Sequence, residues 1–296
     1  MKYKKPPLTY EKQADLLLDR GLIAERNKLI ARLKEVNYYR ITGYLYPYRQ
    51  ADDTFASGTS FDTVWELYTF DRQLRLLVMD AIERIEVSVR SKLVYHFVHQ
   101  YGPFGYCDKA NLSGLSEEKY AHWISDLHGE TQRSREKFIE HFNEAYADCH
   151  DMPPLWMTAE VMSFGKVLSF YKGVESSIRQ RAAEEYGLPD MLLESWLMTL
   201  NIVRNICAHH GRLWNKELRM KPKFPSRNKH PQWYAEPRIS NNRMCAVFMV
   251  LRFMVRRIAP QSEWHLRVES LLEKHPNVRR APMGLFEGWT EHPVWK

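Results

Sequence analysis

A run of apolar residues at helical spacing between Phe61 and about Gln100 restricts the fold more than any other feature of this 296-residue chain. The apolar residues recur three or four positions apart, which is the period of one buried face of an α-helix. They are Leu74, Val78, Ile82, Ile85, Val89, Leu93 and Phe97. The sequence therefore predicts one long helix with a buried face.

Shorter helices are expected on both sides of this long helix. Thr9 can serve as the N-cap and Gly21 as the stop of the first one. Pro189 suits the first turn of a later helix, and Gly211 suits the position just past its end. Alternating apolar and polar residues, which indicate strands, are scarce. The expected helices cover residues 10–20, 24–36 and 61–100, two or three segments within 116–149, and residues 163–186, 190–210, 241–258 and 262–274, so we expect an all-α fold class.

Turn-forming residues after the second helix mark a candidate domain boundary. The segment NYYRITGYLYPYRQADDTFASGTS contains Gly43, Pro47 and clusters of Asp, Ser, Thr and Gly, which interrupt any long helix. We expect an N-terminal helical extension over residues 1–60, a helical core over 61–275 and a C-terminal tail over 276–296.

Composition narrows the classes of partner and compartment. The chain has 43 Lys plus Arg against 36 Asp plus Glu, and the resulting net charge of +7 favours a polyanionic partner. The four cysteines form no C-x-x-C pair, so they indicate neither a zinc ribbon nor a disulfide framework. No apolar stretch is long enough for a membrane span, and no nucleotide-binding glycine motif or metal-ligand spacing is present. We expect a cytoplasmic protein with no cofactor and no metal.

The stretch NIVRNICAHHGRLWN, residues 201–215, ends an otherwise apolar helix with several hydrogen-bonding side chains. Asn205 and His209 are four residues apart and share a face, whereas Arg204 and His209 differ by about 140° around the helix. Arg204 and His209 can meet if the last turn unwinds near Gly211 or if the arginine side chain sweeps round the helix. They can also meet if a second subunit supplies its own copy across a two-fold axis.

Two interpretations of this Arg-His combination stay open on spacing alone. An imidazole titrates near neutral pH, and a guanidinium binds phosphate oxygens in a two-pronged way, so the pair suits a phosphodiester of RNA attacked by its own 2′-hydroxyl. Alternatively, the histidine complements the negative end of the helix dipole and the arginine pairs with a carboxylate elsewhere.

The whole stretch RNICAHHGRLWN resembles the R-N-x-x-x-H signature of HEPN-domain ribonucleases, specifically the Abi-like family of abortive-infection proteins of the AbiD and AbiF type. The segments LKEVNYYRITGYLYPYR and YTFDRQLRLLVMDAIERIEVSVRSKL resemble the same family. The resemblance implies a HEPN-type helical bundle, a homodimer that brings two such helices together, and metal-independent cleavage of RNA. It also implies that Arg204 binds and polarises the scissile phosphate, that Asn205 orients the motif and that His209 transfers protons. His210 and Arg212 are further candidates for catalysis or RNA contact, and for His210 a role in capping the helix is equally open.

A polar stripe on the long helix carries Glu83, Glu86 and Arg90. Glu86 and Arg90 can pair along the helix, and such a stripe is commonly a solvated face or an internal salt bridge. The resemblance adds a second interpretation, in which Glu83 or Glu86 reaches across to hold Arg204, as an acidic residue on a neighbouring helix does in many HEPN proteins.

Two basic segments are candidate RNA-binding surfaces. The segment RMKPKFPSRNKH carries five basic residues and no acidic one. This composition suits binding to the phosphate backbone, and it also suits a surface loop that only increases solubility. The segment YYRITGYLYPYR mixes arginines with five tyrosines, which stack bases in an RNA-binding surface or pack between helices in a structural one. The residues expected to contact RNA are Arg219, Lys221, Lys223, Arg227, Lys229, Arg40 and Arg49.

These features predict a homodimeric endoribonuclease of an abortive-infection or toxin-antitoxin defence system that cleaves RNA by 2′-hydroxyl transesterification. The alternative is a non-catalytic RNA-binding module that keeps the HEPN scaffold and holds a small non-coding RNA. A third interpretation is a helical interaction protein whose basic loop is only surface. RNA is the expected partner, as the substrate and as a small non-coding antitoxin.

Overall fold

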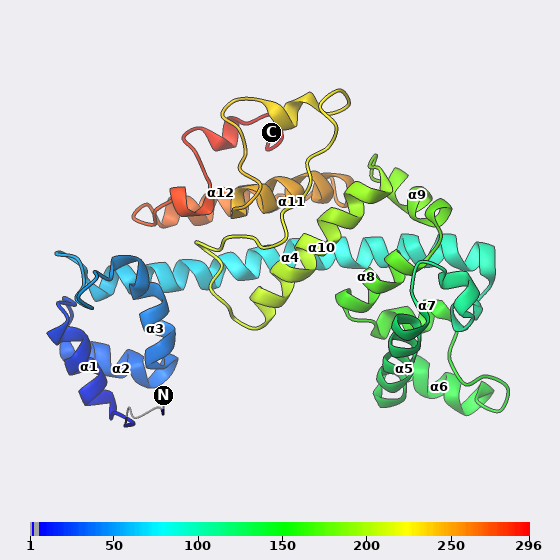
Figure 1. Ribbon diagram of the computed structural model, residues 1–296, viewed down its shortest axis with the longest axis horizontal. Coiled ribbons are helices and arrows are strands. Elements are labelled where there is room, and N and C mark those ends of the chain that lie inside the picture. Colours follow the sequence, from blue (N-terminus) through cyan, green and yellow to red (C-terminus); the bar gives the residue numbers. More distant parts are fainter. Residues whose placement is uncertain (1, 3–5) are drawn as a thin grey trace.

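Helix α4 (Phe61–Tyr101) is the axis of the fold, and the other helices are arranged along it (Figure 1). The computed structural model describes residue 2 and residues 6–296. At 1.5 Å per residue, the 41 residues of α4 span about 60 Å. The seven apolar residues at helical spacing are all buried, so the long helix that the sequence predicts is confirmed.

Three short helices gather at the first end of α4: α1 (Tyr10–Asp19), α2 (Arg26–Val36) and α3 (Tyr38–Leu45). The Thr9 side chain caps α1, as expected, by accepting the Lys12 N–H at 3.3 Å. Helix α3 was not expected, because Gly43 lies within its sequence and Pro47 follows it, and both residues favour turns. It forms because Asn37 caps it and because three of its side chains, Ile41, Tyr44 and Leu45, are buried.

The segments beyond the second end of α4 are also helical, as the sequence predicts, except that the short helix over residues 155–158 was not expected. A serine caps α5 and another caps α8, each accepting a backbone N–H in the first turn of its helix. The helices in this part are α5 (Glu117–Arg133), α6 (Lys137–Tyr146), α7 (Leu155–Thr158), α8 (Phe164–Gly173) and α9 (Ser176–Glu184).

Helix α10 (Asp190–Ala208) packs against α4, as do α11 (Met244–Ile258) and α12 (Trp264–Lys274). The Trp264 indole N–H ties α12 to α4 by donating to the Leu77 carbonyl at 2.8 Å. The segment after α12 folds back on the core, where Trp295 is buried and its carbonyl accepts the Arg252 Nε–H at 2.9 Å.

The described part of the chain contains no β-strand, only two isolated bridges, so the all-α fold class is confirmed. The division of the chain at residues 60 and 275 stays a prediction. None of the helices formed by the described residues combines the length and the apolar character that a membrane crossing requires.

Candidate functional site

The R-N-x-x-x-H residues stay on a regular helix up to the last one. The His209 N–H donates to the Asn205 carbonyl at 3.0 Å, so the helix does not unwind before His209. Arg204 and His209 therefore keep a separation of about 140° around α10. Of the three routes that could bring them together, unwinding of the last turn is wrong. The reach of the Arg204 side chain and a second subunit remain.

The chain leaves α10 through a left-handed turn at His210, not at Gly211. His210 has φ +55°, and its N–H donates to the Cys207 carbonyl at 3.0 Å while the Gly211 N–H donates to the Ile206 carbonyl at 2.7 Å. These two bonds form a Schellman motif. Gly211 is needed for close approach instead, because a Cβ there would lie 3.1 Å from Ile206. A left-handed backbone costs a non-glycine residue about 1–2 kcal/mol.

One face of α10 is open to solvent. Met191, Met198, Ile202, Asn205 and His209 lie within an arc of about 60° around the helix. Met191 is 54% exposed and Ile202 36% exposed, and Asn205 and His209 are also exposed. We call these five residues the open face of α10. Arg204 is partly exposed and lies outside this arc.

Glu86 on α4 lies in the electrostatic field of Arg204. Burial raises the pKa of Glu86, and the positive charges of Arg90 and Arg204 oppose that rise. Arg90 donates to Glu86 at 3.0 Å, which confirms the pairing along the helix. Among the described residues, neither Glu86 nor the exposed Glu83 forms an ion pair with Arg204, so the role of these acids in holding Arg204 stays a proposal.

The residues that follow the motif are anchored by a buried carboxylate, Asp71 of α4. Asp71 accepts the Tyr44 hydroxyl at 2.7 Å and an Arg75 N–H at 2.7 Å. It also accepts the backbone N–H groups of Leu213 and Trp214, the shorter of these bonds being 2.6 Å. Burial and the charge of Asp71 raise the pKa of Tyr44 above its ordinary value. The Asp71 carboxylate is therefore fully hydrogen-bonded inside the protein.

Two arginines hold the carbonyls of the left-handed turn. Arg40 of α3 donates to the His210 carbonyl at 2.8 Å, and Arg75 donates to the Gly211 carbonyl at 3.2 Å. Because carbonyls at a helix end lack helical partners, these two guanidinium groups satisfy acceptors that would otherwise need water. They fix the end of α10 against both α3 and α4.

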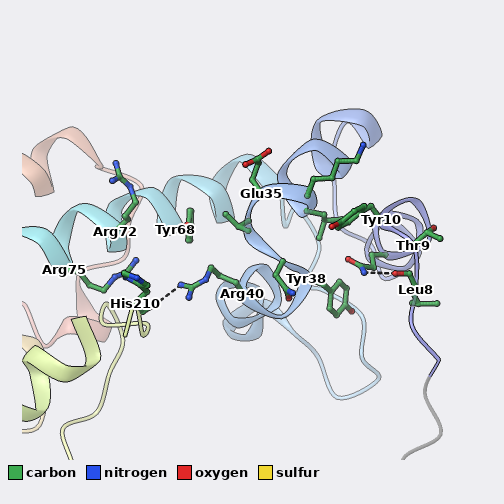
Figure 2. Close-up of a pocket in the computed structure, with 15 residues that line it drawn as sticks. Leu8, Thr9, Tyr10, Glu35, Tyr38, Arg40, Tyr68, Arg72, Arg75 and His210 are labelled. Atoms are coloured by element: carbon green, nitrogen blue, oxygen red, sulfur yellow. Dashed lines mark hydrogen bonds between the residues drawn. The ribbon is translucent and has the colours of Figure 1, made fainter. Parts of the chain in front are cut away.

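A pocket lies between the N-terminal helices and the start of α4 (Figure 2). Its walls include Arg40, Arg72, Arg75 and His210, and its volume is about 800 Å³. Arg204, Asn205 and His209 are not among the described residues that line it. The two adjacent histidines thus differ in place, since His209 belongs to the open face of α10 and His210 to this pocket.

The arginines of the predicted RNA-binding surface near the N-terminus are already engaged. Arg49 forms an ion pair with Asp53, which offsets its charge. Arg40 holds the turn after α10, and Arg212 donates to the Gly43 carbonyl. We therefore assign to Arg40 and Arg212 a part in fixing the turn after α10, besides the RNA contact that the sequence suggests for them.

The basic segment after the motif is tied to α10. The Lys223 N–H donates to Ser195 Oγ at 3.0 Å, and its carbonyl accepts the Trp196 indole N–H at 2.8 Å. The Thr199 hydroxyl donates to the Met220 carbonyl at 3.4 Å. The segment therefore runs along α10 on an anchored backbone. Its five basic side chains, Arg219, Lys221, Lys223, Arg227 and Lys229, are all exposed.

Three residues of this site were missed at the sequence level: Asp71, Arg75 and Tyr44. The i,i+4 spacing of Asp71 and Arg75 was a signal that could have been noticed. Their burial was not readable, because it depends on partners such as Trp214, which is 143 residues away. Within residue 2 and residues 6–296, no three His, Cys, Asp or Glu side chains gather in a way that would hold a metal ion.

Comparison with known proteins gives a family. Searches of the curated proteins and of the solved structures found no match. The family model described as Abi-like protein matches residues 31–215, which is more than half of the chain. The match begins inside α2, includes the whole of α4 and ends after the turn at the end of α10. This chain belongs to the Abi-like protein family.

Proposed function

We propose that this protein is a HEPN-type, metal-independent endoribonuclease that acts in abortive-infection defence, and that RNA is its substrate. Membership of the Abi-like family suggests an abortive-infection-type function. The observation that carries the finer proposal is that Arg204, Asn205 and His209 occupy the last turns of one helix and all reach solvent.

The chemistry follows from the side chains. The ribose 2′-oxygen attacks the adjacent phosphorus, the bond from phosphorus to the 5′-oxygen breaks, and the products are a 2′,3′-cyclic phosphate and a 5′-hydroxyl. Arg204 binds the non-bridging phosphate oxygens in a two-pronged way. His209 serves proton transfer between the 2′-hydroxyl and the leaving 5′-oxygen. Asn205 orients the phosphate and the Arg204 guanidinium, to which its side-chain oxygen lies at 3.5 Å.

A homodimer can bring an Arg204 and a His209 together from two copies of α10. Arg204 and His209 point to different sides of α10, so a second copy across a two-fold axis brings the Arg204 of one chain toward the His209 of the other. The open face of α10 supports this arrangement, because it joins exposed apolar residues, Met191 and Ile202, to Asn205 and His209. Pairing two such faces buries the apolar residues and brings Asn205 and His209 of the two chains together, and Arg204 then reaches in from outside the paired faces.

Cleavage of RNA tests the assignment. We expect His209→Ala and Arg204→Ala each to lower the rate by about 10²–10⁴-fold, because one proton-transfer or phosphate-binding group is lost. The wild-type reaction is expected to persist in EDTA. His128→Ala, an exposed histidine on α5, and Arg84→Ala, an exposed arginine on α4, are matched controls that should cleave normally. Unchanged cleavage by both motif variants would refute the catalytic roles.

The alternative is an RNA-binding module without cleavage, favoured by the five exposed basic side chains beside α10. Sequencing the RNA that copurifies with wild-type and His209→Ala protein separates the two functions. Trimmed ends that appear with wild-type protein only support the nuclease. Identical intact RNA in both samples, with no cleavage after the RNA is stripped, supports the binding module and its small non-coding RNA partner.

A further inference from the structure

The pocket beside His210 has the size of a small-molecule site. Its volume is about 800 Å³, within the range of about 300–1,000 Å³ that ligand pockets occupy. It lies between α1, α2 and α3 on one side and α4 on the other, and the end of α10 contributes His210 (Figure 2). It is therefore separate from the motif residues on α10.

One end of the pocket is cationic. On α4, Tyr68, Arg72 and Arg75 follow one another at intervals of four and three residues, so they share the face that lines the pocket. Arg40 comes from α3 on the opposite wall, and its guanidinium bonds to the neutral His210 carbonyl. Figure 2 shows Arg40 and Arg75 extending toward His210, whereas the side chain of Arg72 extends away from them.

The charges at this end are only partly balanced. Asp71 offsets the charge of Arg75. Arg40, Arg72 and Lys34 form no ion pair within the described part of the chain, and Glu35 is the acid among the described lining residues. This excess of positive charge favours an anion, and the fork of an arginine matches the oxygens of a phosphate.

The other end of the pocket is aromatic and apolar. Tyr10, Tyr38 and Leu8 lie there (Figure 2), and the apolar lining of the pocket also includes Leu33 and Val36. Tyr10 is 43% exposed and Tyr38 is partly buried, so each has ring surface that a flat group can cover. Stacking of a base on an aromatic side chain contributes about 1–3 kcal/mol.

We propose that this pocket binds a nucleoside phosphate, with the phosphate beside Arg40 at the cationic end and the base placed toward Tyr38. The ligand is either a free nucleotide or the 5′-phosphorylated end of an RNA chain, which share this chemistry. The proposal does not depend on RNA cleavage, because none of the three motif residues lines the pocket.

Calorimetric titration of the full-length protein tests it. The probes are the four nucleoside 5′-monophosphates, inorganic phosphate and adenosine. At least one nucleotide is expected to bind tenfold or more tightly than phosphate or adenosine alone. Arg72→Ala should weaken nucleotide binding about threefold or more, because the cationic end of the pocket loses a positive charge. Arg84→Ala, on the same helix but outside the pocket, should change it less than twofold.

A second pair of variants tests the aromatic end. Tyr38→Ala is expected to weaken nucleotide binding about fivefold or more and to leave binding of inorganic phosphate unchanged, whereas Tyr146→Ala on α6 changes neither. Binding of nucleotides no tighter than that of inorganic phosphate would overturn the proposal. Equal effects of Arg72→Ala and Arg84→Ala would overturn it too.

The source of the ligand is identified with RNA oligonucleotides on His209→Ala protein, which removes the proposed cleavage from the measurement. Competition with the mononucleotide by a 5′-phosphorylated oligonucleotide, but not by its 5′-hydroxyl counterpart, assigns the pocket to an RNA end. Binding of the mononucleotide alone assigns it to a free nucleotide. Either result supports the pocket whether or not the wild-type protein cleaves RNA.

Discussion

The last turns of α10 and the turn that follows them are adjacent in the chain but use their polar groups differently. On the open face of α10, Asn205 and His209 are exposed to solvent. In the next residues, from His210 to Trp214, backbone groups are bound by Arg40, Arg75 and the buried Asp71. The first region keeps polar groups available, and the second uses them to fix position.

Under the proposed function, this difference accounts for the many hydrogen-bonding residues at the end of an apolar helix. A group that acts on a ligand must be free, yet its backbone must be held in one place. Here the anchor is made by residues from α3 and α4 and not by the motif itself. Changes in the anchor should therefore alter stability, and changes on the open face should alter association and activity.

The largest effect on stability is expected from Asp71→Asn. This change removes the charge that pairs with buried Arg75, and breaking a buried pair costs about 3–5 kcal/mol. Urea unfolding measures the loss. Asp62→Asn is the matched control, because Asp62 lies on the same helix in an exposed pair with Lys28 and its loss should cost less than about 1 kcal/mol. Similar stabilities of the two variants would show that Asp71 does not anchor the turn.

On the open face, Ile202→Asp should weaken the proposed homodimer at least tenfold with little effect on unfolding. The isoleucine is 36% exposed in one chain, and the proposed pairing of two α10 helices buries it beside its copy. Sedimentation at several protein concentrations gives the dissociation constant. Leu266→Asp, at an exposed leucine of α12, is the control. A wild-type protein that stays monomeric would contradict this use of the open face.

A smaller effect, of opposite sign, is expected at the turn itself. His210→Gly should raise the free energy of unfolding by about 0.5–1 kcal/mol, because glycine adopts the left-handed backbone without the strain that histidine bears at φ +55°. His209→Gly should instead destabilise, since His209 has φ −88° at the end of the helix. Thermal or urea unfolding of both variants compares them. A loss of stability in both would mean that the His210 side chain contributes more than the strain costs.

The smallest effect concerns pH. Burial raises the pKa of Glu86 above its ordinary value of 4.5, so its contribution to stability is complete below that value and is lost as pH rises through the folded-state pKa. Glu86→Gln removes this loss, and the stability of the variant relative to wild type should therefore increase from about pH 4.5 toward neutrality. Unfolding curves across this range measure the trend, with exposed Glu83→Gln as control. If the stability of Glu86→Gln relative to wild type falls as pH rises, the raised pKa of Glu86 is contradicted.

The fold was predictable where the information is local. The spacing of apolar residues along α4 was enough to predict a long helix over residues 61–100 with a buried face, because helical periodicity depends on neighbours within a few residues. The placement of Arg204, Asn205 and His209 near a helix end was readable in the same way. Helix α3 was missed, since its formation depends on the burial of Ile41, Tyr44 and Leu45 against other helices.

The sequence by itself determined that the chain is helical, that an Arg, an Asn and a His share the last turns of one helix, and that basic residues follow them. Only the tertiary structure decided that His210 takes the left-handed turn, that Asp71 anchors the residues after it, and that the neighbouring histidines face different surroundings. The physical reason is distance along the chain. Helix periodicity acts over four residues, whereas the contacts of Asp71 with Leu213 and Trp214 join positions 142 and 143 residues apart.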